Sequence, residues 1–240
     1  MNGKEMLHFG IIGKPLGHSQ SKKFFDERFA AFGIDADYSI HEIEAIEEVV
    51  PLLDLLDGLN VTSPYKEAII PYLNEIDPVA REIGAVNVVY KHHGYNTDWI
   101  GVTEAIKPYV TKQDRQAMVL GSGGAANAVR YALQQMGLNV SVVSRQPGKG
   151  DLTYAELTED VIAAHRIIAN CTPLGMFPLD SEMPDLPWDG INGKHLLFDC
   201  IYNPAETLFL KKGKEQGAQT VNGYAMFVAQ AEAALRIFFN

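Results

Sequence analysis

The sequence predicts an α/β protein of two domains, and three observations lead to this prediction. Short apolar strands alternate with helical patterns over the first hundred residues. A polar stretch, Thr111 to Arg115, then interrupts the pattern and marks a domain boundary. Beyond it the order becomes strand, glycine-rich turn, helix and strand, which is typical of a parallel sheet with a phosphate-binding turn.

Apolar runs and helical spacing define the elements of the first region. Strands are expected at residues 9–12, 38–40, 59–61 and 86–90. Helices are expected at 22–32 and 46–56, and a connecting helix at 99–109, closed by Pro108.

The second region starts with a strand at 117–120. A helix with the apolar face Val129, Ala132, Leu133 and Met136 follows, and Gly137 ends it before a strand at 140–143. Further strand ends are expected within 167–176 and 196–204. The stretch 178–193 is rich in proline, glycine and acidic residues, which indicates a surface excursion. A helix at 225–239 closes the chain.

Composition excludes several classes of protein. The 240 residues are 47% hydrophobic and 21% charged, as in an ordinary globular protein, and the net charge of −10 argues against nucleic-acid binding. No apolar run approaches the roughly 20 residues that cross a bilayer. The start, Met1 to Met6, does not resemble a signal peptide, so a cytoplasmic protein is expected. No histidine or cysteine spacing predicts a metal site, and Cys171 and Cys200 are expected to be buried thiols.

The glycine-rich turn predicts a dinucleotide site. It reads Gly121-Ser122-Gly123-Gly124-Ala125-Ala126 between a strand and a helix. Gly121 permits the tight turn, Gly123 lets a pyrophosphate approach the backbone, and Ala126 packs the helix on the strand. The helix N-terminus would receive the phosphates. The alternative is a merely structural strand-to-helix turn.

The end of the next strand favours NADP. An acidic residue there would bind the ribose 2′-hydroxyl of NAD. The sequence instead has Ser144-Arg145-Gln146, with Lys149 nearby, and a guanidinium can pair with a 2′-phosphate. The alternative is that Arg145 only lies at the surface end of a strand.

Two polar segments predict a site for a small polyhydroxylated ligand. One runs from Gly58 to Lys66 and offers Asn60, Thr62 and Lys66 at the end of a short strand. The other comprises Ala85-Val86-Asn87 and Asn96-Thr97-Asp98. A lysine beside a carboxylate in a partly dry cleft is suited to general acid/base work. Taken alone, Lys66 fits a solvated surface lysine better, since most lysines in loops are of that kind.

Together these motifs resemble the shikimate dehydrogenase family over essentially the whole chain. The segments that carry the resemblance are Gly17-His18-Ser19-Gln20-Ser21, Asn60 to Lys66, Ala85 to Asn87, Asn96 to Asp98, Gly121 to Ala125, Ser144-Arg145, Asn170 to Met176, Asp199 to Pro204 and the terminal helix with Gln230. The resemblance implies an NADP-linked reduction of 3-dehydroshikimate to shikimate. It also implies a substrate-binding domain at 1–99 plus 222–240 and a Rossmann-like NADP domain at 100–221.

The resemblance also implies roles for individual residues. Lys66 and Asp98 would be the catalytic pair. The substrate-binding residues would be Ser19, Ser21, Asn60, Thr62, Asn87, Tyr202 and Gln230. The cofactor-binding residues would be Gly121, Ser122, Gly123, Gly124, Ala125, Ser144, Arg145, Thr172, Pro173, Met176 and Gly223.

Local structural roles compete with some of these assignments. Ser19 and Ser21 are also suited to capping the helix that starts near Lys22, and Asp98 to capping the next helix. Gln230 is compatible either with exposure or with a ligand hydrogen bond.

The sequence departs from the family pattern at four positions, namely Lys22, Trp99, Asn127 and Ser144, where members often carry proline, glycine, a basic residue and asparagine. Losing one cationic contact to a 2′-phosphate would weaken binding by about 1 to 3 kcal/mol, so NAD remains an alternative cofactor. A quinate/shikimate dehydrogenase and a non-catalytic metabolite sensor are the other functional alternatives. The oligomeric state, monomer or homodimer, stays open.

Overall fold

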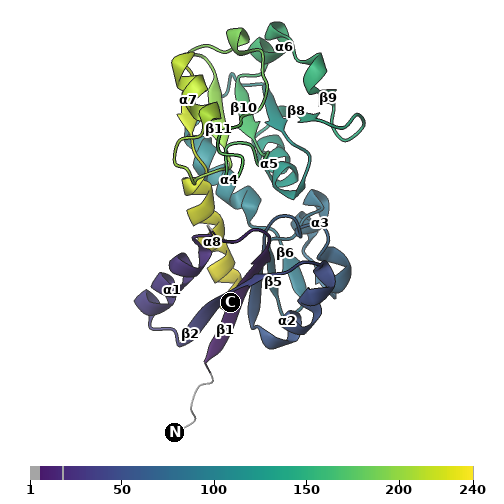
Figure 1. Cartoon of the computed structure of the whole chain (residues 1–240), viewed down its shortest axis with the longest axis vertical. Helices are drawn as coiled ribbons and strands as arrows, with labels where there is room; N and C mark the ends of the chain where they lie inside the picture. Colours follow the sequence, from purple (N-terminus) through teal and green to yellow (C-terminus); the bar gives the residue numbers. More distant parts are fainter. Residues whose placement is uncertain (1–5, 18, 240) are drawn as a thin grey trace. The chain divides into compact units, whose positions relative to one another are not determined.

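The computed structural model describes residues 6–17 and 19–239, and within them the chain forms two compact units, each built on its own six-stranded sheet (Figure 1). The first unit takes the chain up to Thr97 and resumes at Ala231, and the second is Asp98–Gln230. Each unit combines a sheet with helices, so the α/β class is confirmed.

The sheet of the first unit is mixed. Its order is β2-β1-β3-β5-β6-β4, where β1 runs parallel to β2 and β3, and β5 runs antiparallel to β3 and β6. The elements are β1 (Leu7–Gly13), α1 (Ser21–Phe32), β2 (Ala36–Glu42), α2 (Val50–Leu55), β3 (Gly58–Val61), β4 (Glu75–Ile76), α3 (Pro78–Ile83), β5 (Val88–Tyr90) and β6 (His93–Tyr95).

Alternating side chains of β1 supply both faces of this sheet. Phe9 packs with Phe25 and Phe29 of α1 on one face. Ile12 packs with Val61 and other apolar residues on the opposite face. Side chains in a strand point alternately to opposite faces, so one apolar strand can serve two cores.

The sheet of the second unit is parallel throughout, with the order β12-β11-β10-β7-β8-β9. In chain order this is 6-5-4-1-2-3, the order of dinucleotide-binding sheets, and the order reverses between β7 and β10. The elements are α4 (Asp98–Ile106), β7 (Gln116–Leu120), α5 (Gly124–Gln135), β8 (Asn139–Ser144), β9 (Leu152–Thr153), α6 (Glu159–Ala164), β10 (Ile167–Asn170), β11 (Leu196–Asp199), α7 (Leu208–Glu215), β12 (Gln219–Val221) and α8 (Tyr224–Phe239).

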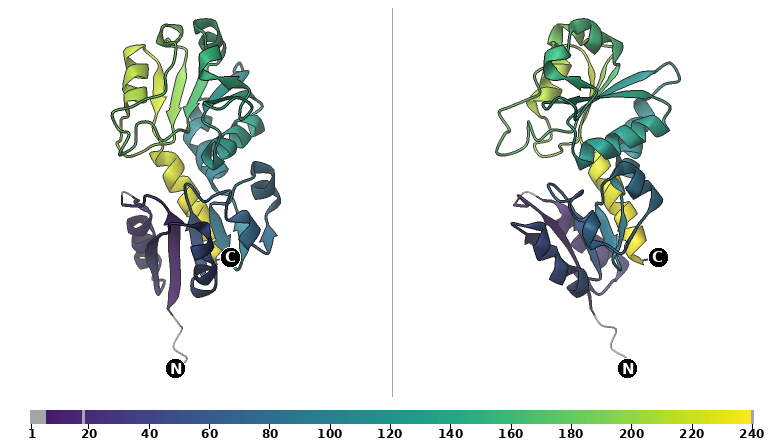
Figure 2. Two further views of the ribbon diagram at one scale, coloured as in Figure 1. Left: turned by 45° about the vertical axis from the view of Figure 1, so that its right-hand side comes forward. Right: turned by 90° about the vertical axis from the view of Figure 1, so that its right-hand side faces the viewer.

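Helices cover both faces of this parallel sheet (Figure 2). Val119 of β7 packs in the cluster that includes α4 and α5, while Met118 packs in the cluster that includes α6 and α7. A strand that is buried on both faces has a continuously apolar sequence, as the buried run Ala117 to Leu120 has.

The C-terminal helix α8, yellow in Figure 1, contributes residues to both units. Met226 belongs to the core of the second unit. Ala231, Ala234 and Phe238 belong to the core of the first.

Proline explains why one expected helix is divided. The segment expected as a single helix at 46–56 forms a 3₁₀ turn, Ile46–Val49, followed by α2. Pro51 lies in the first turn of α2, the position where its missing N–H leaves no helical hydrogen bond unmade.

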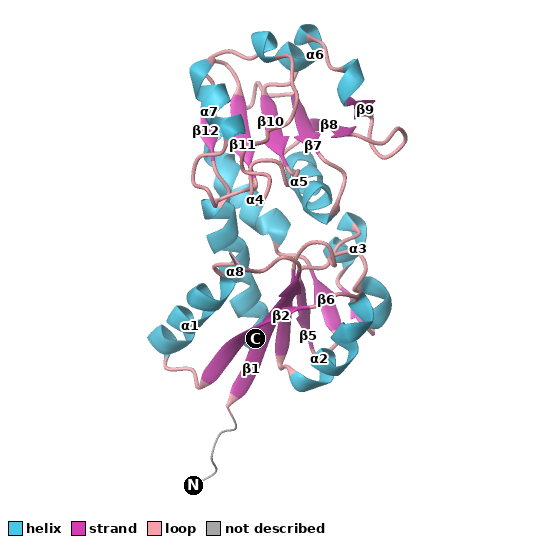
Figure 3. Ribbon diagram, in the orientation of Figure 1, coloured by secondary structure: helices cyan, strands magenta, loops and turns pink. Residues whose placement is uncertain are grey.

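The stretch 178–193, expected as a surface excursion, is exposed over much of its length but also contributes side chains to the core. Leu186 and Ile191 are buried, with 5% and 2% of their surfaces exposed. They pack with Phe209 of α7, and Met183 and Trp188 lie against the same cluster. Between β10 and β11 the chain forms no long helix (Figure 3). Apolar residues spaced among its prolines and acids pack in the cluster on one face of the sheet.

Within the part of the chain that the structure describes, no helix is both long and apolar enough to cross a membrane.

Candidate active site

A tight turn at the carboxyl end of β3 carries Thr62 and Lys66. The Thr62 amide donates to the Ile12 carbonyl at 2.9 Å, and the Lys66 carbonyl accepts from the Val86 amide at 2.8 Å. A Cβ placed at Gly13 would lie 2.4 Å from Cγ2 of Thr62, so only glycine fits at this point of β1. The backbone of the turn is therefore fixed on both sides, and both side chains are half-buried.

A hydrogen bond joins the buried side chains of Tyr38 and Asn60: the Tyr38 hydroxyl donates to Oδ1 of Asn60 at 2.8 Å. Burial raises the pKa of Tyr38 well above its ordinary value, and the neighbouring Ser21 side chain offsets this only in part, so the phenol stays protonated as a donor.

The amide of Asn87 is held by Thr97. Its Oδ1 accepts from the Thr97 amide at 2.7 Å, and its Nδ2 donates to Thr97 Oγ1 at 2.9 Å. The Asn87 carbonyl accepts from the Val61 amide, which ties this segment to β3. In this way the structure brings Asn60, Thr62, Lys66 and Asn87 together at one edge of the sheet.

Asp98 follows Thr97 directly and is the first residue of α4, with 4% of its surface exposed. The indole of Trp99 meets the ring of Tyr131 edge-on at 5.7 Å. The large side chain beside the predicted catalytic carboxylate is therefore packed against α5.

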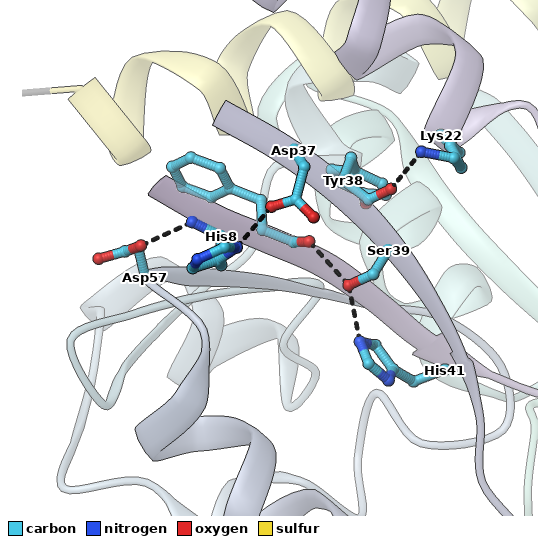
Figure 4. A network of polar contacts seen from close by, with 8 residues as sticks. His8, Lys22, Asp37, Tyr38, Ser39, His41 and Asp57 are labelled. Atoms are coloured by element: carbon cyan, nitrogen blue, oxygen red, sulfur yellow. Dashed lines mark hydrogen bonds and ion pairs between the residues drawn. The ribbon is translucent and has the colours of Figure 1, made fainter. Parts of the chain in front are cut away.

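Ser19 has a local hydrogen bond at the start of α1. Its Oγ accepts from the Ser21 amide at 3.3 Å, while Gln20 is the residue that precedes the helix and makes no side-chain cap. Lys22, another departure from the family pattern, donates to the Tyr38 carbonyl at 2.7 Å (Figure 4). His18, part of the same sequence motif, lies outside the described residues.

The glycine-rich turn of the second unit is suited to a phosphate. Gly121 has φ +110°, which favours glycine, and its amide donates to the Val143 carbonyl. A Cβ at Gly123 would meet no atom within 4 Å, so the backbone there is open to a ligand. No side chain caps the N-terminus of α5, and its amides remain available to an anion. These features fit the pyrophosphate of NADP.

The end of β8 carries the residues that would meet a 2′-phosphate. Ser144 is buried, and its Oγ lies 3.2 Å from Oγ of Ser122. Arg145 is exposed and lies near the phenol of Tyr154. Burial raises the pKa of Tyr154 to about 12, and the positive charge of Arg145 partly offsets this.

Three buried polar side chains join the loops after β10 and β11. Asp199 accepts from Thr207 Oγ1 at 2.6 Å and from Asn170 Nδ2 at 3.2 Å. Asn170 Oδ1 accepts from Thr172 Oγ1 at 2.7 Å. Burial raises the pKa of Asp199 to about 6, although these hydrogen bonds and one from the Ile201 amide lower it. The network fixes the loop that bears Thr172 and Pro173.

The remaining predicted residues also lie in the second unit. Met176 is 40% exposed. The ring of Tyr202 lies 4.8 Å from that of Phe227 in α8, and Gln230 donates to the Phe227 carbonyl at 3.0 Å. A Cβ at Gly223 would lie 2.1 Å from the Cys200 carbonyl oxygen, so glycine is required there by close packing.

Other polar contacts in the first unit hold strands together and lie apart from the predicted site residues. His8 binds Asp37 and Asp57, and Ser39 donates to the Phe9 carbonyl, which joins β1 to β2 and to the start of β3 (Figure 4). A hollow of about 360 Å³ at this end is lined by none of the predicted site residues. The described residues contain no group of three or more His, Cys, Asp or Glu side chains placed to hold a metal.

Sequence reasoning gave no individual role to four residues that orient the predicted site, namely Tyr38, Thr97, Asn170 and Asp199, although the last three lie in segments that it singled out. Their partners are distant in sequence or come from a neighbouring loop. One signal was present: a tyrosine in a buried strand needs a partner for its hydroxyl. The two cysteines, expected to be buried, are both half-buried because they lie just beyond the strand ends.

Comparison with known proteins places the chain in a family. A family model described as the shikimate dehydrogenase substrate binding domain matches residues 11–89. The shikimate dehydrogenase (NADP(+)) of Methanosphaera stadtmanae is 36% identical, over 99% of this chain and 93% of its own.

Two solved structures extend this likeness to the fold. The shikimate dehydrogenase of Aquifex aeolicus superposes with a TM-score of 0.88 at 35% identity, covering 99% of this chain and 94% of its own. The enzyme of Thermus thermophilus in complex with NADP(H) and shikimate gives 0.86 at 29% identity, covering 97% and 93%. With a relative this similar over nearly its whole length, the chain belongs to the shikimate dehydrogenase family.

Proposed function

We propose that this protein catalyses the reversible NADPH-dependent reduction of 3-dehydroshikimate to shikimate, a step toward chorismate and the aromatic amino acids. The main structural support is the set of polar side chains at the end of β3, where Asn60, Thr62, Lys66 and Asn87 lie on a fixed backbone. Amides, a hydroxyl and an amine are suited to a polyhydroxylated ring. The Thermus thermophilus relative carries both shikimate and NADP(H).

We assign substrate binding to residues 1–99 with 222–240. Ser19 and Ser21 would bind the substrate carboxylate. Thr62, Asn87 and Gln230 would bind the ring hydroxyls. Asn60 and Tyr202 complete the proposed substrate contacts.

Lys66 and Asp98 are proposed as the catalytic pair. Reduction of a ketone builds negative charge on its oxygen, which an ammonium can stabilise and then protonate. Asp98 would orient Lys66 and bind a neighbouring hydroxyl. Asp98 follows Thr97, whose amide is fixed by Asn87, so its backbone is anchored at that point. Bound NADPH would supply the hydride.

We assign NADP binding to residues 100–221 with the neighbouring Gly223. The pyrophosphate would lie on the turn from Gly121 to Ala125, against the open backbone at Gly123. Ser144 and Arg145 would bind the 2′-phosphate. Thr172, Pro173, Met176 and Gly223 would line the nicotinamide side.

We further propose a cytoplasmic enzyme with small-molecule partners only, either a monomer or a homodimer. The acidic net charge of −10 supports the exclusion of nucleic acid as a partner.

Initial rates with shikimate and with quinate, each with NADP and with NAD, test the proposed function. We expect the highest kcat/KM with shikimate and NADP. Dominant oxidation of quinate with NAD would instead make the protein a quinate dehydrogenase. Binding of shikimate without formation of NADPH at any pH would reveal a non-catalytic sensor.

A further inference from the structure

The two cysteines of the chain lie side by side at the ends of neighbouring strands. Cys171 directly follows β10, and Cys200 directly follows β11. Their Sγ atoms are 3.6 Å apart, and both residues are half-buried thiols. The sequence contains two cysteines in all, so a disulfide within the chain can join only Cys171 to Cys200.

The backbone positions suit a disulfide. Asn170 and Asp199, the preceding residues, are paired in the parallel register of β10 and β11, and the Cys200 amide donates to the Asn170 carbonyl at 3.0 Å. Neighbouring strands lie about 4.7 to 4.9 Å apart. Disulfides span Cα separations of about 4.4 to 6.8 Å. Rotation of the two side chains and a small backbone shift therefore suffice to bring the sulfur atoms to bonding distance.

Both cysteines also pack against the predicted cofactor turn and its neighbours. A Cβ at Gly121 would lie 3.2 Å from the Cys171 carbonyl oxygen, and the Cys171 amide donates to the Leu120 carbonyl. The Cys200 carbonyl lies against Gly223 in the same way. Because the backbone at each cysteine is closely packed against a glycine, a shift at either cysteine displaces the glycine-rich turn or the loop that begins at Thr172.

We propose that Cys171 and Cys200 form a reversible disulfide site whose closure weakens binding of the dinucleotide at the glycine-rich turn. The identity of that ligand rests on the proposed function, whereas the disulfide itself does not. The oxidant is a small-molecule disulfide such as oxidised glutathione. One cysteine thiolate attacks it, releases one thiol and forms a mixed disulfide. The other thiolate then attacks the protein sulfur and releases the second thiol, so two protein thiols are oxidised while one glutathione disulfide is reduced.

Thiol counting and intact mass after incubation with oxidised glutathione test the site directly. We expect the wild-type protein to lose both titratable thiols and two hydrogen masses without gaining glutathione or dimerising. Cys171→Ser and Cys200→Ser should each retain glutathione as a mixed disulfide, because the second thiol is absent. Recovery of both thiols with dithiothreitol is the control for reversibility. A wild-type protein that keeps both thiols, or only accumulates glutathione, would refute the site.

NADPH titration of the same samples tests the consequence. Oxidation should raise the Kd for NADPH about tenfold, within the usual range of coupling between linked sites. The Cys171→Ser/Cys200→Ser double variant should bind NADPH equally well with and without the oxidant. Hydrogen exchange of the amides in 121–124 provides a readout that does not need a ligand, and it should change on oxidation. If the disulfide forms but neither the hydrogen exchange of 121–124 nor the Kd for NADPH changes, the proposed coupling between the disulfide and dinucleotide binding is refuted. Absence of NADPH binding by the reduced protein would count against the proposed function instead.

Discussion

The hydroxyl of Tyr38 donates a 2.8 Å hydrogen bond to Oδ1 of Asn60, so a residue of β2 orients an amide of β3 across the intervening strand β1. Tyr38 has 1% of its surface exposed and Asn60 has 6%. The ring of Tyr38 stacks on Phe25 at 4.4 Å, which leaves the hydroxyl little freedom. Tyr38, which no sequence pattern assigned to the site, thus fixes the side chain of Asn60, which was assigned to it.

Tyr38→Phe should loosen the predicted substrate site while keeping the stacked ring. Asn60 would lose the donor to its buried Oδ1, which is expected to destabilise the fold by about 1 to 3 kcal/mol. We expect the KM for shikimate to rise more than kcat falls. Tyr72→Phe, which removes a hydroxyl near Glu47 in the same unit, is the control. Equal kinetics for wild type and Tyr38→Phe would show that Asn60 needs no such orientation.

Gly123→Ala should weaken NADP binding without harming the fold. The added Cβ meets no protein atom within 4 Å, and φ is an ordinary −99°. It would occupy the space proposed for the pyrophosphate, and a Kd for NADPH raised about tenfold corresponds to about 1.4 kcal/mol. The melting temperature should stay unchanged.

Gly121→Ala is the contrasting variant, because its φ of +110° disfavours any side chain. It should lower stability by more than about 1 kcal/mol. If both variants behaved alike in calorimetry and in binding, the separate roles given to the two glycines would be wrong.

Arg145→Ala should reduce the preference for NADP. Hydrogen bonds to charged groups contribute about 1.5 to 3 kcal/mol, so the KM for NADP should rise by roughly 10- to 150-fold. Kinetics with NAD, which lacks the 2′-phosphate, should hardly change. Arg130→Ala, an exposed arginine of α5, is the control. A parallel loss with both cofactors would indicate that Arg145 acts on the fold rather than on the 2′-phosphate.

Asp199 should make the free energy of unfolding depend on pH. Burial raises the pKa of its carboxyl to about 6, so the folded state holds a proton that the unfolded chain releases near pH 4. The stabilisation due to this proton is fully present below about pH 4 and is lost as the pH rises to about 6. The free energy of unfolding should fall by about 3 kcal/mol over this range.

Denaturant titrations from pH 4 to 7 check this dependence. Relative to the wild type, Asp199→Asn should remove this fall in stability, because an amide does not ionise in this pH range and its oxygen can still accept from Thr207. Asp180→Asn, at an exposed carboxylate, should leave the fall in place. An identical pH profile for wild type and Asp199→Asn would rule out a protonated Asp199.

The parts of the fold that the sequence predicts are those with a local cause. The strand, the glycine-rich turn and α5 follow from apolar runs and from glycines that a tight turn requires, and all appear within a residue or two of their expected bounds. β9 and β12 were not expected, since a strand of two or three residues is too short to show an alternation of apolar and polar side chains. Pro51 was visible in the sequence, yet its effect depends on where the helix begins.

In the candidate site, too, the sequence predicts the local features and not the contacts between distant segments. Residue types such as the amides and Lys66 are readable from the segments that carry them. The hydrogen bond from Tyr38 to Asn60 depends on strand order, and the approach of Cys171 to Cys200 depends on the register of β10 and β11. Both depend on which strands pair, and a single segment of sequence does not show its pairing partner.

Formation of NADPH from shikimate and NADP by the wild type and by Lys66→Ala, measured side by side, tests the central claim most directly. Lys107→Ala, at an exposed lysine, serves as the control. We predict rapid turnover by the wild type and the control, and a kcat about 10² to 10⁴ lower for Lys66→Ala with a KM for shikimate that changes far less. A wild type that forms no NADPH, or a Lys66→Ala variant that keeps its kcat and only raises KM, would contradict the assignment of Lys66 as the proton donor of a shikimate dehydrogenase.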